Sequence, residues 1–325
     1  MPYKYKSAVR HHIDKKSVSR DWNKYNKQLV KRGDISIWIT DDIADSWYES
    51  ERIYDGTGTP QLYNETAILI SHQIRQVFKL PLRQCEGFIN ALFKLMGFEL
   101  KCPHYSVLSK RLKKLNLNQP VYRLAHRDYD QVKSIAIDSS GLQCFEHDEW
   151  FTEKYGENRR KKNWRKLHIT VDNYQIIQTA VLTERKIQDS EVVEELISPM
   201  NRNVNHFTAD AAYDGNPTYQ LLSKKFPLAN LVIQPQKNAV DDQKNSFYRN
   251  RNVREINCYG QMQWQELRGY GKRNQAELAF SRYKRILGGK LHAREFSRQR
   301  QEAIIGCSIL NKMTLGMLGE IRQKN

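Results

Sequence analysis

The sequence predicts an α/β fold preceded by a helical region. Before about residue 129, apolar residues recur at intervals of three and four, as they do on one face of a helix. Beyond that point, short apolar strand patterns alternate with helical ones, which is typical of a sheet covered by helices. The expected helices are 65–78, 81–96, 105–115, 189–197, 218–225, 270–284 and 298–317, and the expected strands are 134–138, 167–171, 175–182, 204–210 and 228–233.

Composition favours a polyanionic partner. The 325 residues include 53 Lys and Arg against 36 Asp and Glu, a net charge of +17, which is typical of proteins that bind nucleic acid. No apolar run reaches the roughly 20 residues that span a bilayer, and Met1–Lys6 lacks the apolar segment of a signal peptide. We therefore expect a cytoplasmic protein, associated with the nucleoid when bound to DNA. Five scattered cysteines without a C-x-x-C pair predict neither a disulfide framework nor a zinc site.

The region before the predicted sheet divides into two parts. Residues 1–55 form a strongly basic arm that could lie along phosphates, although a solvated tail is the alternative. Residues 56–128 carry three predicted helices, the last of which turns Lys110, Arg111 and Lys114 outward. Such a trio matches a helix-turn-helix module whose last helix enters the major groove, and a plain helical bundle stays open. The α/β domain would occupy residues 129–325.

Three carboxylates are the candidate catalytic residues. Asp138 and Asp210 each end a predicted strand, and ligand sites in α/β sheets collect beyond the carboxyl ends of strands. A helix that follows the last strand could lay Glu277 beside them. Three carboxylates in one pocket repel each other, and divalent cations with a preference for oxygen, Mg²⁺ or Mn²⁺, relieve that repulsion. Taken singly, each aspartate could instead simply form a turn.

The segment from Tyr270 to Lys284 carries an unusual stripe of polar side chains. At about 100° per helical residue, Arg273, Glu277 and Lys284 lie at about 300°, 340° and 320° from Tyr270. An aromatic hydroxyl, one carboxylate and two cations on one face suit a metal site that handles phosphates. The alternative is a capping box in which Asn274 and Glu277 only close the helix start.

These motifs resemble those of the DDE transposases encoded by bacterial insertion sequences, most closely the insertion sequence five group. The spacing of Tyr270, Arg273, Glu277 and Lys284 matches that group's Y-R-E-K signature. Further matching blocks are Pro81-Leu-Arg-Gln-Cys-Glu-Gly-Phe88, Ile137-Asp-Ser-Ser-Gly-Leu142, Trp164-Arg-Lys-Leu-His168, Ala209-Asp-Ala-Ala-Tyr-Asp214 and Leu287-Gly-Gly-Lys-Leu291. The resemblance covers nearly the whole chain.

The resemblance implies a ribonuclease-H-like catalytic core. Asp138, Asp210 and Glu277 would bind two Mg²⁺ or Mn²⁺ ions, and the enzyme would bind terminal inverted repeats, cleave strands and join 3′ ends to target DNA. We expect a homodimer in the complex with double-stranded DNA. The expected DNA contacts are Tyr270, Arg273, Lys284, Trp164, Arg165, Lys166, Lys110, Arg111 and Lys114.

Some alternatives stay open. Trp164 could stack on an extruded base, or it could be a core residue. A stand-alone nuclease with the same core, or a DNA-binding regulator without catalysis, are the competing functions. Asp210 and Glu277 are 67 positions apart, so we expect only a short insertion between them.

Overall fold

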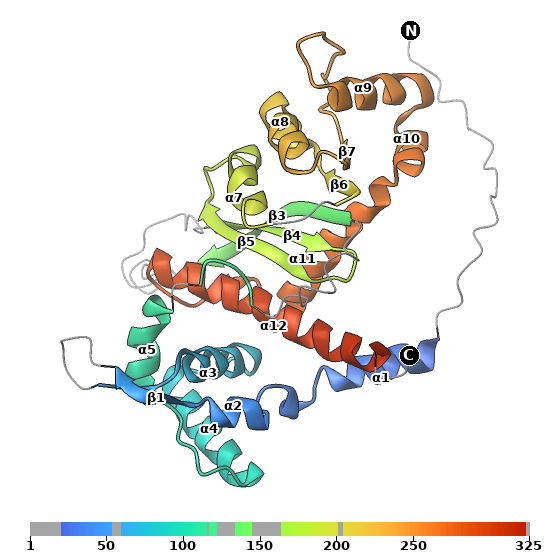
Figure 1. The fold of residues 1–325 in the computed structure, drawn as a ribbon. Coiled ribbons are helices and arrows are strands. Elements are labelled where there is room, and N and C mark those ends of the chain that lie inside the picture. The colour runs from blue at the N-terminus through green and yellow to red at the C-terminus, as the bar shows by residue number, and fades with distance from the viewer. Residues whose placement is uncertain are drawn as a thin grey trace, which may run out of the picture.

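A six-stranded mixed sheet lies at the centre of the molecule (Figure 1). The computed structural model describes residues 21–53, 60–115, 117–121, 134–144, 164–200 and 204–322. The strand order is β5-β4-β3-β6-β7, and β8 pairs with the end of β3. β3, β4 and β5 are antiparallel neighbours, whereas β6 and β7 continue the sheet in parallel with β3. The bounds are Ser134–Cys144 (β3), Trp164–Asp172 (β4), Ile177–Glu184 (β5), His206–Ala209 (β6), Asn230–Ile233 (β7) and Lys290–Leu291 (β8).

Different helices cover the two faces of the sheet, because successive side chains of a strand point to opposite sides. On β3, Ile135 and Ile137 belong to the apolar cluster formed with α7 (Val193–Ile197) and α8 (Asn216–Lys225). Ala136 belongs to the cluster formed with α11 (Asn274–Ile286) and α12 (Phe296–Arg322). Figure 1 shows α7 and α8 above the sheet and α12 below it. Asp138 has the same parity as Ala136, so it faces α11.

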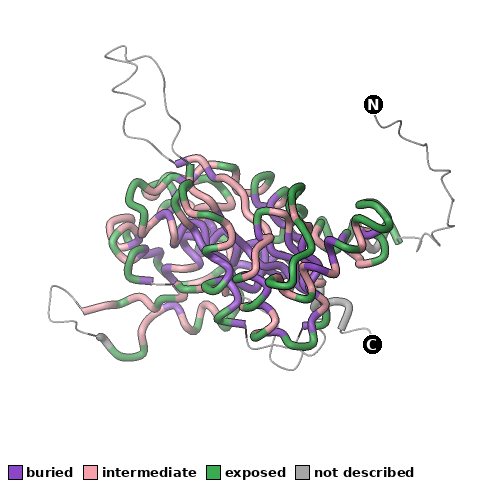
Figure 2. The backbone as a smooth tube through the Cα atoms, turned by 90° about the horizontal axis from the view of Figure 1, so that it is seen from above, coloured by how far each residue is buried: buried purple, intermediate pink, exposed green. Residues whose placement is uncertain are grey.

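The N-terminal helices share their core with the last helix of the chain. The three predicted helices are present as α3 (Glu65–Val77), α4 (Leu82–Met96) and α5 (Tyr105–Lys114). Their apolar side chains form one cluster with Ile305 and Ile309 of α12. Figure 2 shows the buried segments of the backbone gathered in the middle of the molecule, with exposed segments around them. The predicted boundary near residue 128 lies outside the described residues.

The basic arm is only partly described. Residues 1–20 lie outside the described ranges, and the rest of the arm forms short elements. A hairpin of two strands, which the sequence analysis did not predict, follows them. The bounds are Trp22–Lys31 (α1), Ile35–Ile37 (η1), Asp41–Asp45 (α2), Tyr48–Ile53 (β1) and Gln61–Tyr63 (β2). None of the helices within the described ranges is long and apolar enough to cross a bilayer.

Two predictions about the α/β part were wrong in detail. β3 does not end at Asp138, because Ser139, Ser140 and Gly141 continue the antiparallel pairing with β4 as far as Gln143. The sequence indicated no helix between residues 233 and 270, but this segment contains α9 (Phe247–Tyr259) and α10 (Gln261–Arg268). Trp264 is fully buried against Val232 of β7 and Tyr270, which holds this helical insertion on the end of the sheet.

The other predicted elements are confirmed to within a few residues. β4 and β5 form the expected hairpin, where the Asp172 carboxylate accepts hydrogen bonds from the Tyr174 and Ile176 N–H groups at 2.8 and 3.0 Å. The helix expected from residue 189 begins as the 3-10 turn η3 (Asp189–Val192). Gln188 and Glu191 form the capping box of this turn.

Candidate active site

Asp138 and Asp210 lie on neighbouring parallel strands. β3 and β6 pair Ser134 with His206 and Ala136 with Thr208, and continuing this register by two residues brings Asp138 opposite Asp210. Asp210 directly follows β6 and caps the 3-10 turn η4 (Ala211–Tyr213), accepting the Ala212 N–H at 3.0 Å. The strand-end position predicted for Asp210 is therefore confirmed. Asp138 lies within β3. It is level with Asp210 because β6 ends just before Asp210, whereas β3 continues beyond Asp138.

Glu277 is joined to Asp138 through Arg273. The predicted helix begins as a 3-10 turn, η5 (Tyr270–Arg273), before α11 starts at Asn274. The Arg273 guanidinium lies 3.4 Å from an Asp138 carboxylate oxygen and makes a second ion pair with Glu277 one helical turn away. The guanidinium of Arg273 therefore links Glu277 to Asp138.

The capping-box alternative is not formed. Asn274 lies inside α11, and the residue that precedes the helix makes no side-chain capping hydrogen bond. Lys284, near the other end of α11, donates a hydrogen bond to the Ser140 hydroxyl at 2.7 Å. Arg273 and Lys284 therefore both contact residues of β3, whereas Arg285 lies about 100° away from Lys284 around α11. This geometry supports the predicted stripe.

Both aspartates of the acidic cluster have raised pKa values, chiefly because they are partly buried. Burial raises the pKa of Asp138 to about 6, and the charges of Asp210 and Glu277 act in the same direction. The Ser139 N–H, 2.8 Å from the carboxylate, and Arg273 oppose that rise. Burial raises the pKa of Asp210 as well.

The donor chemistry of the cluster suits a divalent cation. Three carboxylates supply only hard oxygen ligands, which Mg²⁺ and Mn²⁺ prefer. The side chains are not yet arranged as a closed metal cage: within the described ranges, no three His, Cys, Asp or Glu side chains lie close enough together to hold an ion. Arg273 supplies the compensating charge instead. The residues therefore fit the metal chemically, and Asp138, Asp210 and Glu277 would have to move together to hold it.

Tyr270 contacts Arg273 beside the acidic cluster. It is 7% exposed, and burial raises its pKa to about 12, so its hydroxyl stays protonated at neutral pH. The Arg273 guanidinium lies 5.7 Å from its ring centroid, and the Trp264 ring lies 5.3 Å away on α10. A cation over an aromatic face is stabilised by the ring quadrupole. Tyr270 therefore helps to fix Arg273 beside the carboxylates.

The residues predicted to contact DNA from β4 are largely engaged within the chain. Trp164 is 38% exposed and lies over Gly141, where an added Cβ would be 3.1 Å from the indole. Arg165 contacts Gln299 at 3.3 Å and lies over the ring of Phe296. Lys166 donates to Asp189 at 2.9 Å and to the Ile187 carbonyl at 3.1 Å. Trp164 is thus not a core residue, although one side of its indole packs over Gly141.

The comparisons with known proteins identify the family. A family model described as "Transposase DDE domain" matches residues 133–312, more than half of the chain, and another with the same description matches residues 30–147. The chain belongs to the DDE transposase family. Membership implies an enzyme that cleaves and transfers DNA strands with divalent metal ions, typically Mg²⁺ or Mn²⁺. The mixed sheet at the centre of the transposase agrees with the α/β core that the sequence predicts.

One solved structure is similar over most of its length. It is a cryo-EM structure of a piggyBac transposase synaptic complex with hairpin DNA, which is 10% identical in sequence. The alignment covers 91% of this chain and 76% of that chain, with a TM-score of 0.39. This overlap is too loose to relate individual residues of the two transposases.

Sequence reasoning missed a second polar cluster on the opposite face of β3 and β4. Asp189 is paired with Lys166, and its carboxylate lies 3.6 Å from the His168 ring. Burial raises the pKa of Asp210, and the nearby charge of Asp189 raises it further. Burial lowers the pKa of His168 to about 4, so the ring is neutral at pH 7. The available signal was the alternation of Lys166 and His168 along a strand, which places both on one face.

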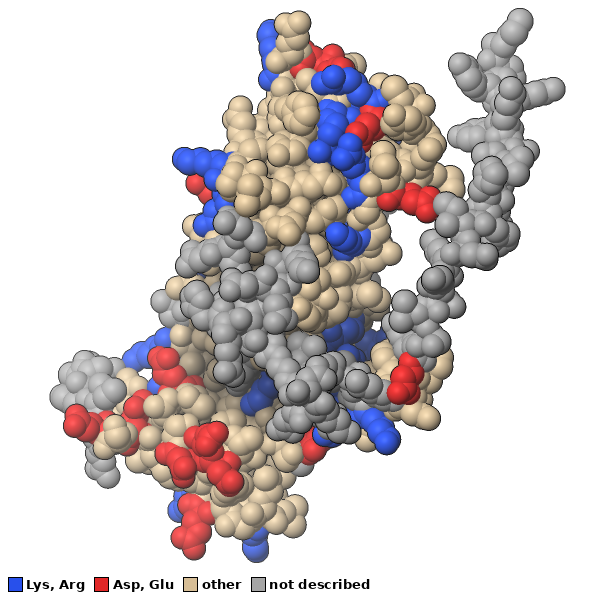
Figure 3. Space-filling model, turned by 45° about the vertical axis from the view of Figure 1, so that its right-hand side comes forward, with Lys and Arg blue, Asp and Glu red and all other residues tan. Residues whose placement is uncertain are grey.

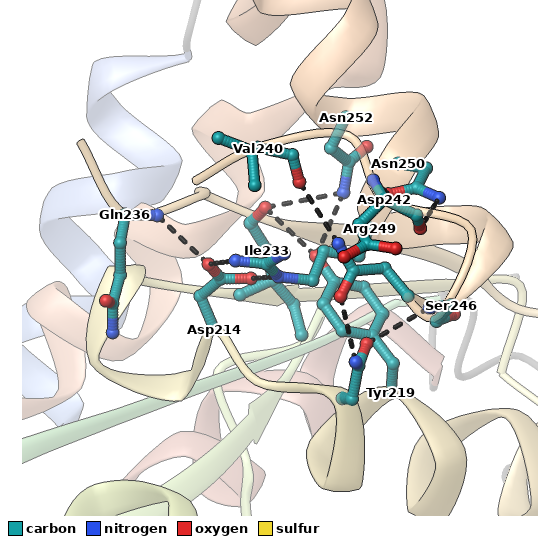
Figure 4. A network of polar contacts seen from close by, with 12 residues as sticks. Asp214, Tyr219, Ile233, Gln236, Val240, Asp242, Ser246, Arg249, Asn250 and Asn252 are labelled. Carbon is teal, nitrogen blue, oxygen red and sulfur yellow. Dashed lines mark hydrogen bonds and ion pairs between the residues drawn. The ribbon is translucent and has the colours of Figure 1, made fainter. Parts of the chain in front are cut away.

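A buried ion pair holds the helical insertion of the transposase (Figure 4). Arg249 of α9 donates two hydrogen bonds to Asp214, at 2.9 and 3.0 Å, and the Gln236 N–H donates a third at 3.1 Å. Asn252 donates to the carbonyls of Leu231 and Ile233 on β7. These bonds fix α9 to the end of the sheet at β7. Asp214 itself lies four residues after Asp210 in the chain. Asp214 is visible in the sequence only as the end of a matched block.

The predicted contacts on α5 of the transposase are exposed to different degrees. Lys110 and Lys114 are exposed, whereas Arg111 is half-buried and donates a hydrogen bond to the Tyr63 carbonyl. On the face drawn in Figure 3, the coloured Lys and Arg side chains extend from the upper to the lower end and are interspersed with acidic ones. Charge alone therefore does not define a single path for DNA on the described surface of this face.

Proposed function

We propose that this transposase binds the terminal inverted repeats of its element, cleaves the strands there and joins the 3′ ends to target DNA. The proposal assigns Asp138, Asp210 and Glu277 as the ligands of two Mg²⁺ or Mn²⁺ ions. It also places the enzyme in the insertion sequence five group, on the Y-R-E-K stripe, and assumes a homodimer in the DNA complex and a cytoplasmic location. The core would then be of the ribonuclease-H-like type.

The observation that carries the proposal is that three elements bring three carboxylates to the same end of the sheet, where the described side chains would still have to move closer to share an ion. Asp138 and Asp210 meet by parallel register, and Glu277 shares Arg273 with Asp138. Asp138, Asp210 and Glu277 would hold the divalent ions, which would supply charge stabilisation for a phosphoryl displacement.

The cations around the triad have a separate role in the proposal. Arg273 and Lys284 contact phosphates on either side of the scissile bond, and the protonated Tyr270 hydroxyl donates to a nearby phosphate oxygen. The exposed side chains of α5, Lys110 and Lys114, position the element end together with Arg111, as in a helix-turn-helix module. Trp164, Arg165 and Lys166 complete the proposed DNA contacts, with Lys166 exchanging Asp189 for a phosphate.

The test compares cleavage with binding on duplex DNA that carries the element's own terminal sequence. Asp138→Asn, Asp210→Asn and Glu277→Gln should each reduce Mg²⁺-dependent cleavage by more than about a thousandfold, the scale on which loss of an essential catalytic group acts. End binding, measured by fluorescence anisotropy, should change little, because most of it comes from phosphate contacts elsewhere. Glu266→Gln, which removes an exposed carboxylate from α10, is the matched control and should keep full cleavage.

The same assay separates the transposase from a nuclease. Wild-type enzyme that cleaves ends but never joins a pre-cut 3′ end to a second duplex would support the nuclease alternative. Substantial cleavage by any triad variant would remove that residue from the active site.

A further inference from the structure

Arg273 forms ion pairs with two of the three carboxylates that the proposed function assigns as metal ligands. Its guanidinium lies 3.4 Å from Asp138 and pairs directly with Glu277, while its side chain is 19% exposed. A guanidinium is a planar fork of donors that suits carboxylates, and it cannot lose its charge in a protein. The oxygens that Arg273 holds are the ones that a divalent ion would need, so both cannot be satisfied at once.

The surroundings of Arg273 would allow another anion to take the place of its carboxylate partners. Its Nε has no hydrogen-bond partner within the described part of the chain, so the fork is not fully used. Arg273 ends a short 3-10 turn, and Glu277 remains half-exposed. Phosphate offers a guanidinium the same two-point recognition as carboxylate. A DNA phosphate that arrives beside the triad therefore competes with the carboxylates for Arg273.

We propose that Arg273 is an internal counter-ion that closes the acidic triad until DNA arrives, and that a DNA phosphate withdraws it so that divalent ions can bind. The proposal rests on the proposed function, because it takes the triad as the metal site. Metal and DNA then bind cooperatively, and the coupling is reciprocal: each increases the affinity for the other by the same factor. Free enzyme would hold metal weakly, which protects DNA from cleavage before an end is in place.

The experiment measures Mn²⁺ binding directly, as the electron paramagnetic resonance signal of free Mn²⁺, on the full-length protein. We expect a short duplex to raise the Mn²⁺ affinity of the wild type by about tenfold, which is within the usual range of coupling between sites. Arg273→Gln should bind Mn²⁺ about tenfold more tightly than the wild type without DNA, and the duplex should add little. Arg273→Lys keeps the charge and should stay closer to the wild type.

Lys272→Gln is the matched control, because it removes one charge from the adjacent, exposed position of the same turn. If it raises Mn²⁺ affinity as much as Arg273→Gln does, the effect is general electrostatics and the proposal fails. Equal or weaker Mn²⁺ binding by Arg273→Gln would also overturn it, since Arg273 would then serve to orient Glu277.

A further variant separates this proposal from the proposed function. Asp138→Asn should abolish Mn²⁺ binding with and without DNA. If it leaves Mn²⁺ binding unchanged, the triad is not the metal site and the proposed function itself is wrong. If it abolishes binding while Arg273→Gln behaves like the wild type, only the counter-ion proposal is wrong.

Discussion

Asp138 lies opposite Asp210 because two parallel strands of different length bring them to the same level of the sheet. β6 ends at Ala209, whereas β3 continues to Cys144, so one aspartate stands at a strand end and the other within a strand. Neighbouring carboxylates in a partly buried position destabilise each other's charged form. The arrangement therefore costs stability in the absence of a cation, and that cost can be measured.

The first prediction concerns the pH dependence of stability without metal. The pKa of Asp138 is about 6 in the folded protein against 3.8 for the unperturbed group, so the folded state binds this proton more tightly than the unfolded state does. The contribution of Asp138 to stability is therefore largest below pH 4 and is lost as the pH rises from about 4 to about 6. In EDTA at pH 8, Asp138→Asn should be more stable than the wild type by on the order of 2 kcal/mol in urea unfolding.

The advantage of Asp138→Asn should disappear as the pH approaches 4, where the wild-type carboxyl is protonated. Asparagine keeps an oxygen that can accept the Ser139 N–H, which limits other losses. A variant that is less stable than the wild type at pH 8 would show that pairing with Arg273 outweighs the cost of burial.

The second prediction concerns Lys284 and its neighbour Arg285. Both side chains are exposed, but Lys284 donates a hydrogen bond to Ser140 beside the triad, whereas Arg285 lies about 100° away around α11. Lys284→Ala should weaken strand transfer and reduce the salt dependence of DNA binding by about one phosphate contact. Arg285→Ala is the matched control. Equal and negligible transfer defects in both variants would remove Lys284 from the DNA interface.

The third prediction concerns the helical region, where the structure changes which experiment is useful. Ile305 and Ile309 of α12 are buried among α3, α4 and α5, so a fragment 129–325 would expose an apolar surface. We expect that fragment to aggregate or to melt at a lower temperature than the full chain. Selection of the element end is therefore better tested by charge removal in the intact protein.

For that test we expect Lys110→Gln together with Lys114→Gln to reduce the preference for the element end over unrelated duplex. Lys94→Gln, an exposed position on α4, is the control for loss of charge. An unchanged preference in the double variant would argue that α5 is not the recognition helix and that the bundle alternative is correct.

Sequence patterns located most elements, and they failed where long-range pairing decides. The period of the apolar residues was enough for α3, α4 and α12, although residues 301–311 of α12 are buried on all sides. Nothing local indicated that β3 continues past Asp138, since Ser139, Ser140 and Gly141 have low strand propensity and are held by pairing with β4. The helices α9 and α10 were missed because their sequences are rich in polar residues. Their few buried side chains, such as Trp264, are isolated along the chain.

For the site, spacing and resemblance indicated the triad and placed Arg273 and Glu277 on one helix face, where they form an i,i+4 ion pair. The pairing of Arg273 with Asp138 could not be predicted, because it joins η5 to β3. The pairing of Lys166 with Asp189 was equally out of reach, because it joins β4 to a turn beyond β5.

The last prediction concerns the ion pair that holds the helical insertion. The Asp214 side chain is 0% exposed and that of Arg249 is 15% exposed, so removal of one partner leaves a buried charge without compensation. Arg249→Ala should lower the free energy of unfolding by about 3–5 kcal/mol, and the double variant Arg249→Ala with Asp214→Ala should be less affected than the sum of the two single variants. Arg254 and Asp241 form the matched exposed pair on the same insertion, with side chains 57% and 42% exposed. Arg254→Ala should cost less than about 1 kcal/mol. Urea unfolding of these variants gives the coupling energy directly. Equal, small losses in both pairs would mean that the apolar contacts of Trp264, rather than the Asp214–Arg249 pair, hold α9 and α10 on the sheet.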